Sequence, residues 1–392
     1  METQTLVAKI VTEIPPSGIR KYFDFLDDSC ISLGVGEPDF ATPEGIRREA
    51  LRRLSTGRVA YSSNAGMPEL RELILRYLDE RFGISGYSLQ DTLITVGGSQ
   101  AIDLALRAVV DPGDEVIVPE PYYVSYLPIV KLIGGVPVPI AMSRDHRFKI
   151  TPDALKKALS PRTKAMIMPY PNNPTGGIME RADLLAIADV LKDTDVLVIT
   201  DEIYAELTYN GKRHVSFASM PGMKDRTIIL SGFSKAFSMT GWRLGYAVGP
   251  QPFIAAMTKI HQITILCAPT PAQIAGIVAL ERGFQYGWED TMSMIREYDR
   301  RRRYLVDAFN DLGMTCDEPE GAFYVFPSIR CTGLSSEEFS DRLMAEQKVV
   351  AVPGTAFGDA GEGHVRCCYA TDLEKIKVAV DRIAAFLKTC RG

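Results

Sequence analysis

One lysine stands where an amine could act as a nucleophile. Lys235 follows the apolar run Thr227–Leu230 and lies among glycines, hydroxyls and aromatic side chains in residues 231–245. A lysine that is desolvated in such surroundings loses its proton more easily and can form a Schiff base with a carbonyl group. Eight residues later, Arg243 could bind a phosphate through two parallel hydrogen bonds. The alternative for Lys235 is the solvated surface position that most lysines occupy.

Two further segments place polar groups after apolar runs. Asp201 and Tyr204 follow Val196–Thr200, and the string Pro-Asn-Asn-Pro-Thr-Gly at residues 171–176 follows Lys164–Met168. In open α/β sheets, ligands bind beyond the carboxyl ends of the strands, so an acid and a phenol there would face a ligand. Two simpler interpretations remain open. Asp201 could be a helix N-cap, and residues 171–176 could form an ordinary turn.

A third segment suits an anion. Residues 97–100 read Gly-Gly-Ser-Gln, directly after the run Thr92–Val96 and at the start of a predicted helix, Ala101–Val110. Glycines permit a tight turn, and the first N–H groups of a helix have no partner within the helix. Together with the helix dipole they make a phosphate site. A plain tight turn explains the same residues equally well.

The elements between these segments indicate an α/β fold. From about residue 90 to 250, short runs rich in Val, Ile and Thr alternate with amphipathic segments, which predicts strand–helix–strand units. We expect a large domain with a mostly parallel sheet covered by helices on both faces. The predicted strands are Thr92–Val96, Glu115–Val118, Lys164–Met168, Val196–Thr200 and Thr227–Leu230.

The remainder of the chain predicts a smaller α+β domain. A helical pattern runs from about residue 288 to Leu312, and a second helix is expected near Ser336–Glu346. Strands are expected at Ala322–Phe326 and His364–Tyr369, and a last helix closes the chain. The predicted organisation is an N-terminal arm (residues 1–15), a small domain (16–44 and 288–392) and a large domain (45–287).

Composition excludes several classes of protein. The 392 residues carry 44 Lys and Arg against 49 Asp and Glu, a net charge of −5, which disfavours nucleic-acid binding. Seven scattered cysteines and four dispersed histidines predict a reducing cytoplasmic location and no metal site. No apolar run approaches the roughly 20 residues that cross a membrane, and the N-terminus lacks a signal-peptide pattern. Arg300–Arg303 is expected to be a solvated helix face.

Taken together, these motifs resemble those of the class I/II aminotransferases, enzymes of fold type I that use pyridoxal 5′-phosphate. The resemblance extends from residues 34–40, Gly-Val-Gly-Glu-Pro-Asp-Phe, to the region of Arg366. Its most specific part is the string S-K-x-F-x-M-T-G-W-R-x-G at residues 234–245, preceded in the expected order by N-P-T-G and D-E-I-Y.

The resemblance implies a role for each matched residue. Lys235 would bind the cofactor aldehyde and, once freed, move a proton between the substrate Cα and the cofactor. Asp201 would pair with the pyridine nitrogen of the cofactor. Its carboxylate would keep that nitrogen protonated, so that the ring can accept the electron pair left on Cα. Asn173 and Tyr204 would bind the ring oxygen, and Tyr123 would stack on the ring.

The resemblance also implies a phosphate site and a carboxylate site. The phosphate would contact Arg243, Tyr61 from a neighbouring subunit, and a hydroxyl from Ser231 or Ser234, which flank Gly232 where many members carry serine. The substrate α-carboxylate would bind Gly36 and Arg366. A homodimer with shared active sites follows. The remaining phosphate ligands would be the N–H groups of Gly98, Ser99 and Gln100.

The predicted function is therefore ping-pong transfer of an amino group from an amino acid to a 2-oxo acid. Segments 17–21 and 61–66 are similar to those of enzymes that act on N-acetyl-LL-diaminopimelate, while relatives acting on aspartate or aromatic amino acids share much of the pattern. Two alternatives are a β-lyase with the same cofactor and lysine, and a ligand-sensing regulatory domain.

Overall fold

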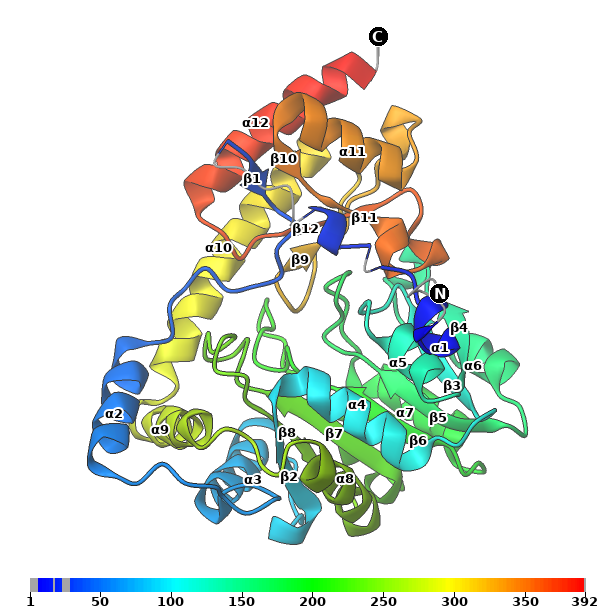
Figure 1. Cartoon of the computed structure of the whole chain (residues 1–392). Coiled ribbons are helices and arrows are strands. Elements are labelled where there is room, and N and C mark those ends of the chain that lie inside the picture. Colours follow the sequence, from blue (N-terminus) through cyan, green and yellow to red (C-terminus); the bar gives the residue numbers. More distant parts are fainter. Residues whose placement is uncertain (1–5, 17, 23–28, 391–392) are drawn as a thin grey trace.

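A central sheet dominates the computed structural model, which describes residues 6–16, 18–22 and 29–390 (Figure 1). Its strand order is β2-β8-β7-β6-β5-β3-β4, with β8 antiparallel to both of its neighbours and every other pair parallel. The strands are β2 (Thr92–Thr95), β3 (Glu115–Glu120), β4 (Val136–Ala141), β5 (Thr163–Met168), β6 (Leu197–Asp201), β7 (Thr227–Gly232) and β8 (Gly245–Val248).

All five strands predicted for this sheet are present, and two further strands were missed. Strand β4 contains Pro137 and Pro139, which argue against a strand, but β4 lies at the edge of the sheet, where proline is tolerated. Strand β8 begins at Gly245. A Cβ there would lie 2.5 Å from the carbonyl carbon of Gly97, so only glycine lets β8 pass this close to the chain beside β2. The mostly parallel α/β architecture is confirmed.

Helices cover both faces of the sheet because neighbouring strand residues point to opposite sides. Ile229 packs into a core cluster with residues of α2 (Glu44–Thr56), α3 (Pro68–Phe82) and α9 (Thr270–Tyr286). Ile228 packs on the other face, in a cluster with residues of α4 (Gly97–Val109), α5 (Tyr126–Leu132) and α8 (Gln251–Thr264). The remaining helices of this part are α6 (Pro152–Ala158) and α7 (Arg181–Leu191).

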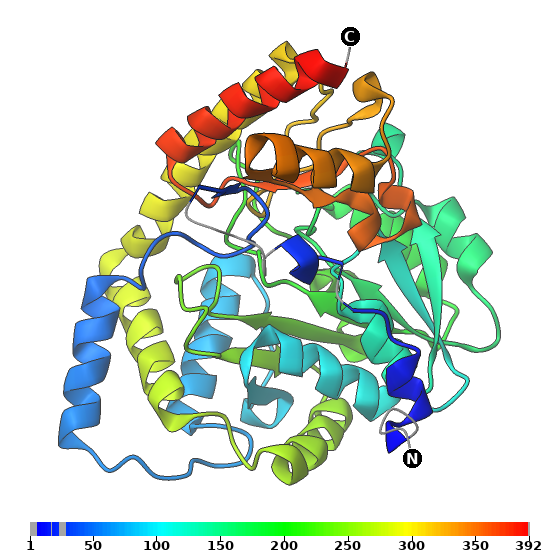
Figure 2. The ribbon, with the colours of Figure 1, turned by 45° about the horizontal axis from the view of Figure 1, so that its top comes forward.

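In Figure 1 a smaller unit lies above the carboxyl ends of the parallel strands of the central sheet. Figure 2 shows the long helices of this unit side by side. It contains α10 (Glu289–Asp311), α11 (Ser336–Gln347) and α12 (Leu373–Cys390), which pack over an antiparallel sheet of order β11-β12-β9. Near the N-terminus, β1 pairs in parallel with β10. The short strands are β1 (Ile31–Ser32), β9 (Tyr324–Val325), β10 (Val349–Val350), β11 (Val352–Pro353) and β12 (Val365–Cys368).

The elements expected in this unit agree with the structure to within a few residues, whereas the domain boundaries stay predictions. A short helix, α1 (Lys9–Thr12), lies in the predicted arm. Residues 1–5 of that arm, and residues 17, 23–28 and 391–392 of the predicted small domain, lie outside the described residues. Within the described part, no helix is long and apolar enough to cross a membrane, and no three His, Cys, Asp or Glu side chains are grouped as metal ligands would be.

The run of four arginines on α10 differs from its prediction. Arg302 has no exposed surface and forms ion pairs with Asp299 at 2.6 Å and Glu318 at 2.7 Å. Arg301 is also buried and pairs with Asp39 at 2.9 Å. The expectation of a solvated face was wrong for these two residues, because α10 packs against partners from distant segments that neutralise the charges.

Candidate active site

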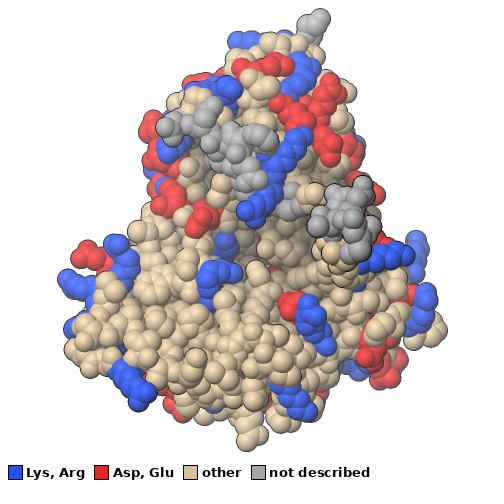
Figure 3. Space-filling model, viewed as in Figure 1, with Lys and Arg blue, Asp and Glu red and all other residues tan. Residues whose placement is uncertain are grey.

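A cavity of about 630 Å³ lies between the smaller unit and the carboxyl edge of the central sheet. Figure 3 shows the surface hollowed at this level, with Lys and Arg side chains above the hollow and to its left. Residues from many separate segments meet here because β5, β6 and β7 are parallel and end at one edge. The predicted site residues that line the cavity are Gly36, Gly98, Ser99, Tyr123, Asn173, Asp201, Tyr204, Ser234, Lys235, Arg243 and Arg366.

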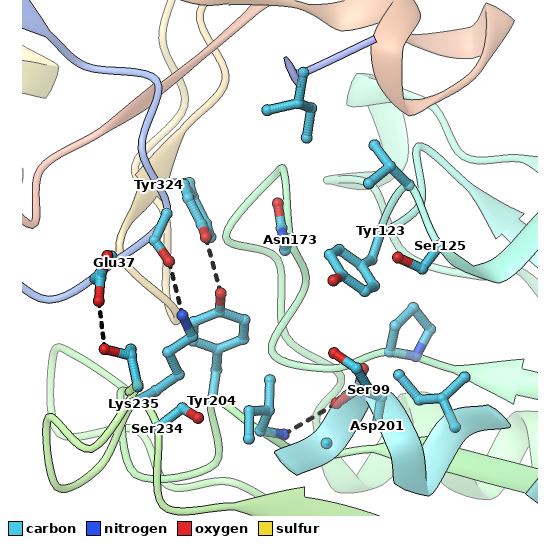
Figure 4. A pocket seen from close by; sticks show the side chains of 18 of the residues that line it. Glu37, Ser99, Tyr123, Ser125, Asn173, Asp201, Tyr204, Ser234, Lys235 and Tyr324 are labelled. Carbon is cyan, nitrogen blue, oxygen red and sulfur yellow. Dashed lines mark hydrogen bonds between the residues drawn. The ribbon is translucent and has the colours of Figure 1, made fainter. Parts of the chain in front are cut away.

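Lys235 extends from the loop after β7 into this cavity (Figure 4). Its Nζ donates a hydrogen bond to the carbonyl oxygen of Gly36 at 2.7 Å and lies 5.4 Å from the centre of the Phe323 ring. Burial lowers the pKa of Lys235 to about 8 from its usual 10.5. A larger share of this lysine is therefore neutral near pH 7 than of a surface lysine, and the neutral amine is the nucleophilic form.

Asp201 is the last residue of β6, and both of its carboxylate oxygens accept hydrogen bonds. The hydroxyl of Tyr126 donates to Oδ2 at 2.6 Å, and the backbone N–H of Ile203 donates to Oδ1 at 3.2 Å. Burial raises the pKa of Asp201, while these two hydrogen bonds oppose the rise. Asp201 does not cap a helix, because a turn follows β6.

The start of α4 and Arg243 together form an anion cradle. The N-cap residue of α4, Val96, makes no side-chain hydrogen bond to the first turn, and Gly97 adopts a φ of +73°, a conformation that suits glycine. A Cβ on Gly97 would lie 2.7 Å from Nη2 of Arg243, so the guanidinium group lies directly against the first turn of the helix. This point combines the N–H groups of a helix start, a helix dipole and a guanidinium group, and such a combination favours the binding of a phosphate.

Arg366, on β12, faces the same cavity from the smaller unit. It is 2% exposed; Nη1 donates to Oδ1 of Asn173 at 2.9 Å and Nη2 to the carbonyl oxygen of Gly34 at 2.5 Å. Within the part of the chain that the structure describes, its Nε has no hydrogen-bond partner. A buried N–H without a partner is costly, so a ligand that accepts this bond is favoured here.

Three predicted residues do not line the cavity. The Gln100 side chain accepts the N–H of Val96 at 2.7 Å, and the Ser231 hydroxyl donates to the carbonyl oxygen of Glu202 at 3.1 Å. Tyr61 is 83% exposed and does not line the cavity of its own chain. Of the two candidate serines, Ser234 is the one at the cavity.

Sequence reasoning missed two tyrosines of the site. The hydroxyl of Tyr324 lies 2.8 Å from that of Tyr204, and its ring lies under the Arg366 guanidinium at 4.5 Å. Tyr126 also lines the cavity and bonds to Asp201. The spacing of Tyr123 and Tyr126, three residues apart at a helix start, could have indicated the second of these, whereas no local signal pointed to Tyr324.

Comparison with known proteins decides the family. The family described as "Aminotransferase class I and II" matches residues 28–383. The chain belongs to this family. It is similar to the aromatic-amino-acid aminotransferase 2 of Thermococcus litoralis and to the aspartate aminotransferase of Pyrococcus abyssi. Each is 42% identical, with 96% of this chain and 96% of the relative covered. Among solved structures, the aspartate aminotransferase of Thermus thermophilus with maleate superposes with a TM-score of 0.90 at 36% identity, covering 97% of this chain and 99% of that one.

The protein is accordingly an aminotransferase that depends on pyridoxal phosphate. Its cavity fits that cofactor in three respects. A buried lysine amine can bind an aldehyde, an uncapped helix start with an arginine can bind a phosphate, and a buried carboxylate can pair with a ring nitrogen. A volume of about 630 Å³ also lies in the range of pockets that enclose small molecules.

Proposed function

We propose that this aminotransferase binds its cofactor between Tyr123, Asp201 and Lys235, with Asn173 and Tyr204 on the ring oxygen and Arg243 on the phosphate. One observation carries the assignment: these six side chains come from four separate segments, at or after the ends of β3, β5, β6 and β7, and all of them line one cavity. Ser234, together with the N–H groups of Gly98 and Ser99, completes the proposed phosphate site. Ser231 and Gln100 do not line the cavity and are less favoured as phosphate ligands.

The remaining groups are suited to orienting an amino acid and moving a proton. When bound, pyridoxal phosphate supplies an aldehyde that exchanges amines and a ring that accepts the electron pair of a broken Cα–H bond. Arg366 is proposed to hold the substrate α-carboxylate through parallel N–H donors, including Nε, which has no hydrogen-bond partner among the described residues. This contact fixes the direction of the Cα–H bond. Lys235, neutral after its release, would take the proton from the substrate Cα and deliver it to the cofactor carbon that carried the aldehyde.

Replacement of Arg366 by alanine tests the carboxylate site. We expect KM for the amino donor to rise about 100-fold, since hydrogen bonds to charged groups contribute about 1.5–3 kcal/mol each. Cofactor affinity should fall much less than substrate affinity, because Arg366 contacts one proposed cofactor ligand, Asn173, while the phosphate cradle at α4 remains. Arg366→Lys keeps the charge but not the planar fork and should give an intermediate KM. Equal loss of cofactor and substrate affinity in Arg366→Ala would contradict the assignment.

The substrate side chain is proposed to contact the cavity wall formed by Ile19, Arg20 and Val124. An apolar surface beside a cation suits both an aromatic ring and a second carboxylate. The substrate class is therefore proposed to include aromatic and acidic amino acids, as the names of the two relatives suggest. The test is a half-reaction screen that follows the cofactor spectrum with aspartate, glutamate, phenylalanine, tyrosine and N-acetyl-LL-diaminopimelate. Accumulation of pyruvate and ammonia would indicate a β-lyase instead.

A homodimer with shared sites is proposed from an exposed apolar patch. The patch contains Val59, Tyr61, Ile263, Ile265 and Leu266. Its two segments are joined by a hydrogen bond from Asn64 to the carbonyl oxygen of Leu266 at 2.8 Å. Contiguous exposed apolar side chains mark interaction surfaces, and a second copy of the chain would bring Tyr61 to the phosphate site of its partner. The seven free cysteines are consistent with the cytoplasmic location that we also propose.

The substitution Ile263→Asp tests the dimer. Ile263 is 86% exposed, so aspartate costs little in the isolated chain, but it would bury a charge in the interface. We expect a monomer by sedimentation velocity, with activity reduced at least tenfold because Tyr61 no longer reaches the partner's site. Val378→Asp, on the distant helix α12, is the matched control and should remain dimeric and active. An Ile263→Asp monomer with full activity would contradict shared sites.

A further inference from the structure

A buried tyrosine that the family motifs do not include contacts the carboxylate of the site. Tyr126 is the first residue of α5 and is 1% exposed. Its hydroxyl donates to Oδ2 of Asp201 at 2.6 Å, and its ring packs edge-on against Tyr123 with 5.5 Å between the ring centres. Tyr126 therefore connects the residue proposed to stack on the cofactor with the residue proposed to face its ring nitrogen.

The groups around Asp201 shift its pKa in opposite directions. Burial and the adjacent Glu202 raise the pKa of Asp201, whereas Tyr126, the N–H of Ile203 and Lys235 lower it. Glu202 itself accepts the Ser216 hydroxyl at 2.6 Å and lies 2.8 Å from Nε2 of His214. Of the groups that stabilise the charged form, Tyr126 gives the shorter of the two hydrogen bonds to the carboxylate.

We propose that Tyr126 is a positioning residue that keeps Asp201 ionised, so that the proton between Asp201 and a pyridine nitrogen stays on the nitrogen. The inference rests on the proposed function, in which Asp201 faces that nitrogen. Burial raises the pKa of Tyr126 well above 10, so the phenol donates a hydrogen bond and does not surrender its proton. Without it, the buried carboxyl would hold the proton itself, and the ring would lose the positive charge that makes it an electron acceptor.

The first experiment uses the protein without cofactor. Infrared difference spectra of Tyr126→Phe, with Asp201→Asn subtracted, report the pH at which Asp201 is protonated. We expect the protonation midpoint of Asp201 to lie about one to two pH units higher in Tyr126→Phe than in the wild-type protein. The shift corresponds to the loss of one hydrogen bond to a charged group. Tyr77→Phe is the matched control: Tyr77 is also buried and donates to a buried carboxylate, Glu206, at 2.8 Å, but lies outside the cavity.

The second experiment uses the protein loaded with cofactor labelled with ¹⁵N in its ring. The nitrogen signal of the wild-type protein and of Tyr77→Phe should be that of a protonated nitrogen, and Tyr126→Phe should move it toward the unprotonated value. The same variant should lower kcat about tenfold while KM for the amino donor changes less than twofold, since Arg366 is untouched. If Tyr126→Phe acted only by weakening the fold, its thermal stability would fall by the same amount as that of Tyr77→Phe.

The outcomes separate the inference from the function on which it rests. If Tyr126→Phe matches the wild-type protein both in the Asp201 midpoint and in the nitrogen signal, the inference is overturned. If the nitrogen signal does not respond to Asp201→Asn, the placement of Asp201 against the ring is wrong, whatever Tyr126 does to the midpoint. If Tyr126→Phe shifts both the Asp201 midpoint and the nitrogen signal, the role of Tyr126 and the placement of Asp201 against the ring are both supported.

Discussion

Replacing Lys235 with alanine is expected to lower kcat for transamination by about 10⁴-fold, the upper end of what a positioned acid–base group contributes. The large effect follows from a double role, because the same amine binds the cofactor and moves the Cα proton. In the structure this amine is partly buried in the cavity wall and donates a hydrogen bond to the carbonyl oxygen of Gly36. Single-turnover kinetics on protein loaded with cofactor would measure the loss.

A control lysine separates this role from general damage. Lys149 is also partly buried and pairs with Asp183 at 2.6 Å, but it does not line the cavity, so Lys149→Ala should keep kcat within about twofold. Borohydride reduction of the loaded wild-type protein should attach the cofactor permanently to Lys235. Recovery of the added mass on another lysine would refute the assignment of Lys235.

The acidity of Lys235 can be measured in the protein without cofactor. The folded-state pKa of about 8 lies below the usual 10.5, so reaction of Lys235 with an amine-selective reagent should rise through a midpoint near pH 8. The sign follows from desolvation, which disfavours the charged form. A midpoint near 10.5 would show that the amine is solvated.

Replacing Asp201 with asparagine is expected to lower kcat by about 10²- to 10³-fold, the range found when one preorganised electrostatic contact is removed. Asparagine keeps the shape but cannot stabilise a cationic ring. Because Arg366 and the α4 cradle remain, KM for the amino donor should change much less than kcat. Steady-state kinetics at saturating cofactor would separate the two parameters.

The adjacent carboxylate provides the matched control for Asp201. Glu202 is buried next to Asp201 but does not line the cavity, so Glu202→Gln should retain kcat within about tenfold. Asp201→Glu, which restores the charge, should recover part of the lost rate. Equal losses in Asp201→Asn and Glu202→Gln would mean that general negative charge, and not a specific contact of Asp201, supports the reaction.

Much of this protein was determined by local sequence. Apolar β-branched runs predicted five strands of the central sheet, because short buried strands need little more than such runs and flanking turns. The same runs placed Asp201 and Lys235 at strand ends, and parallel strands bring their carboxyl ends to one edge. For these residues, chain position alone was enough to predict that they would share a site.

Other features depended on contacts between residues far apart in the chain. Nothing near Tyr324 in the sequence indicates that its hydroxyl would meet Tyr204, and Arg302 is buried only because α10 packs beside the segment that carries Glu318. The charge state of Asp201 was likewise undetermined, since it depends on the hydroxyl that Tyr126 presents from α5. Residue types and spacing determine which strands form and where they end. Desolvation and pairing of a charge depend on atoms within a few ångströms in space, and only the tertiary structure decides which atoms those are.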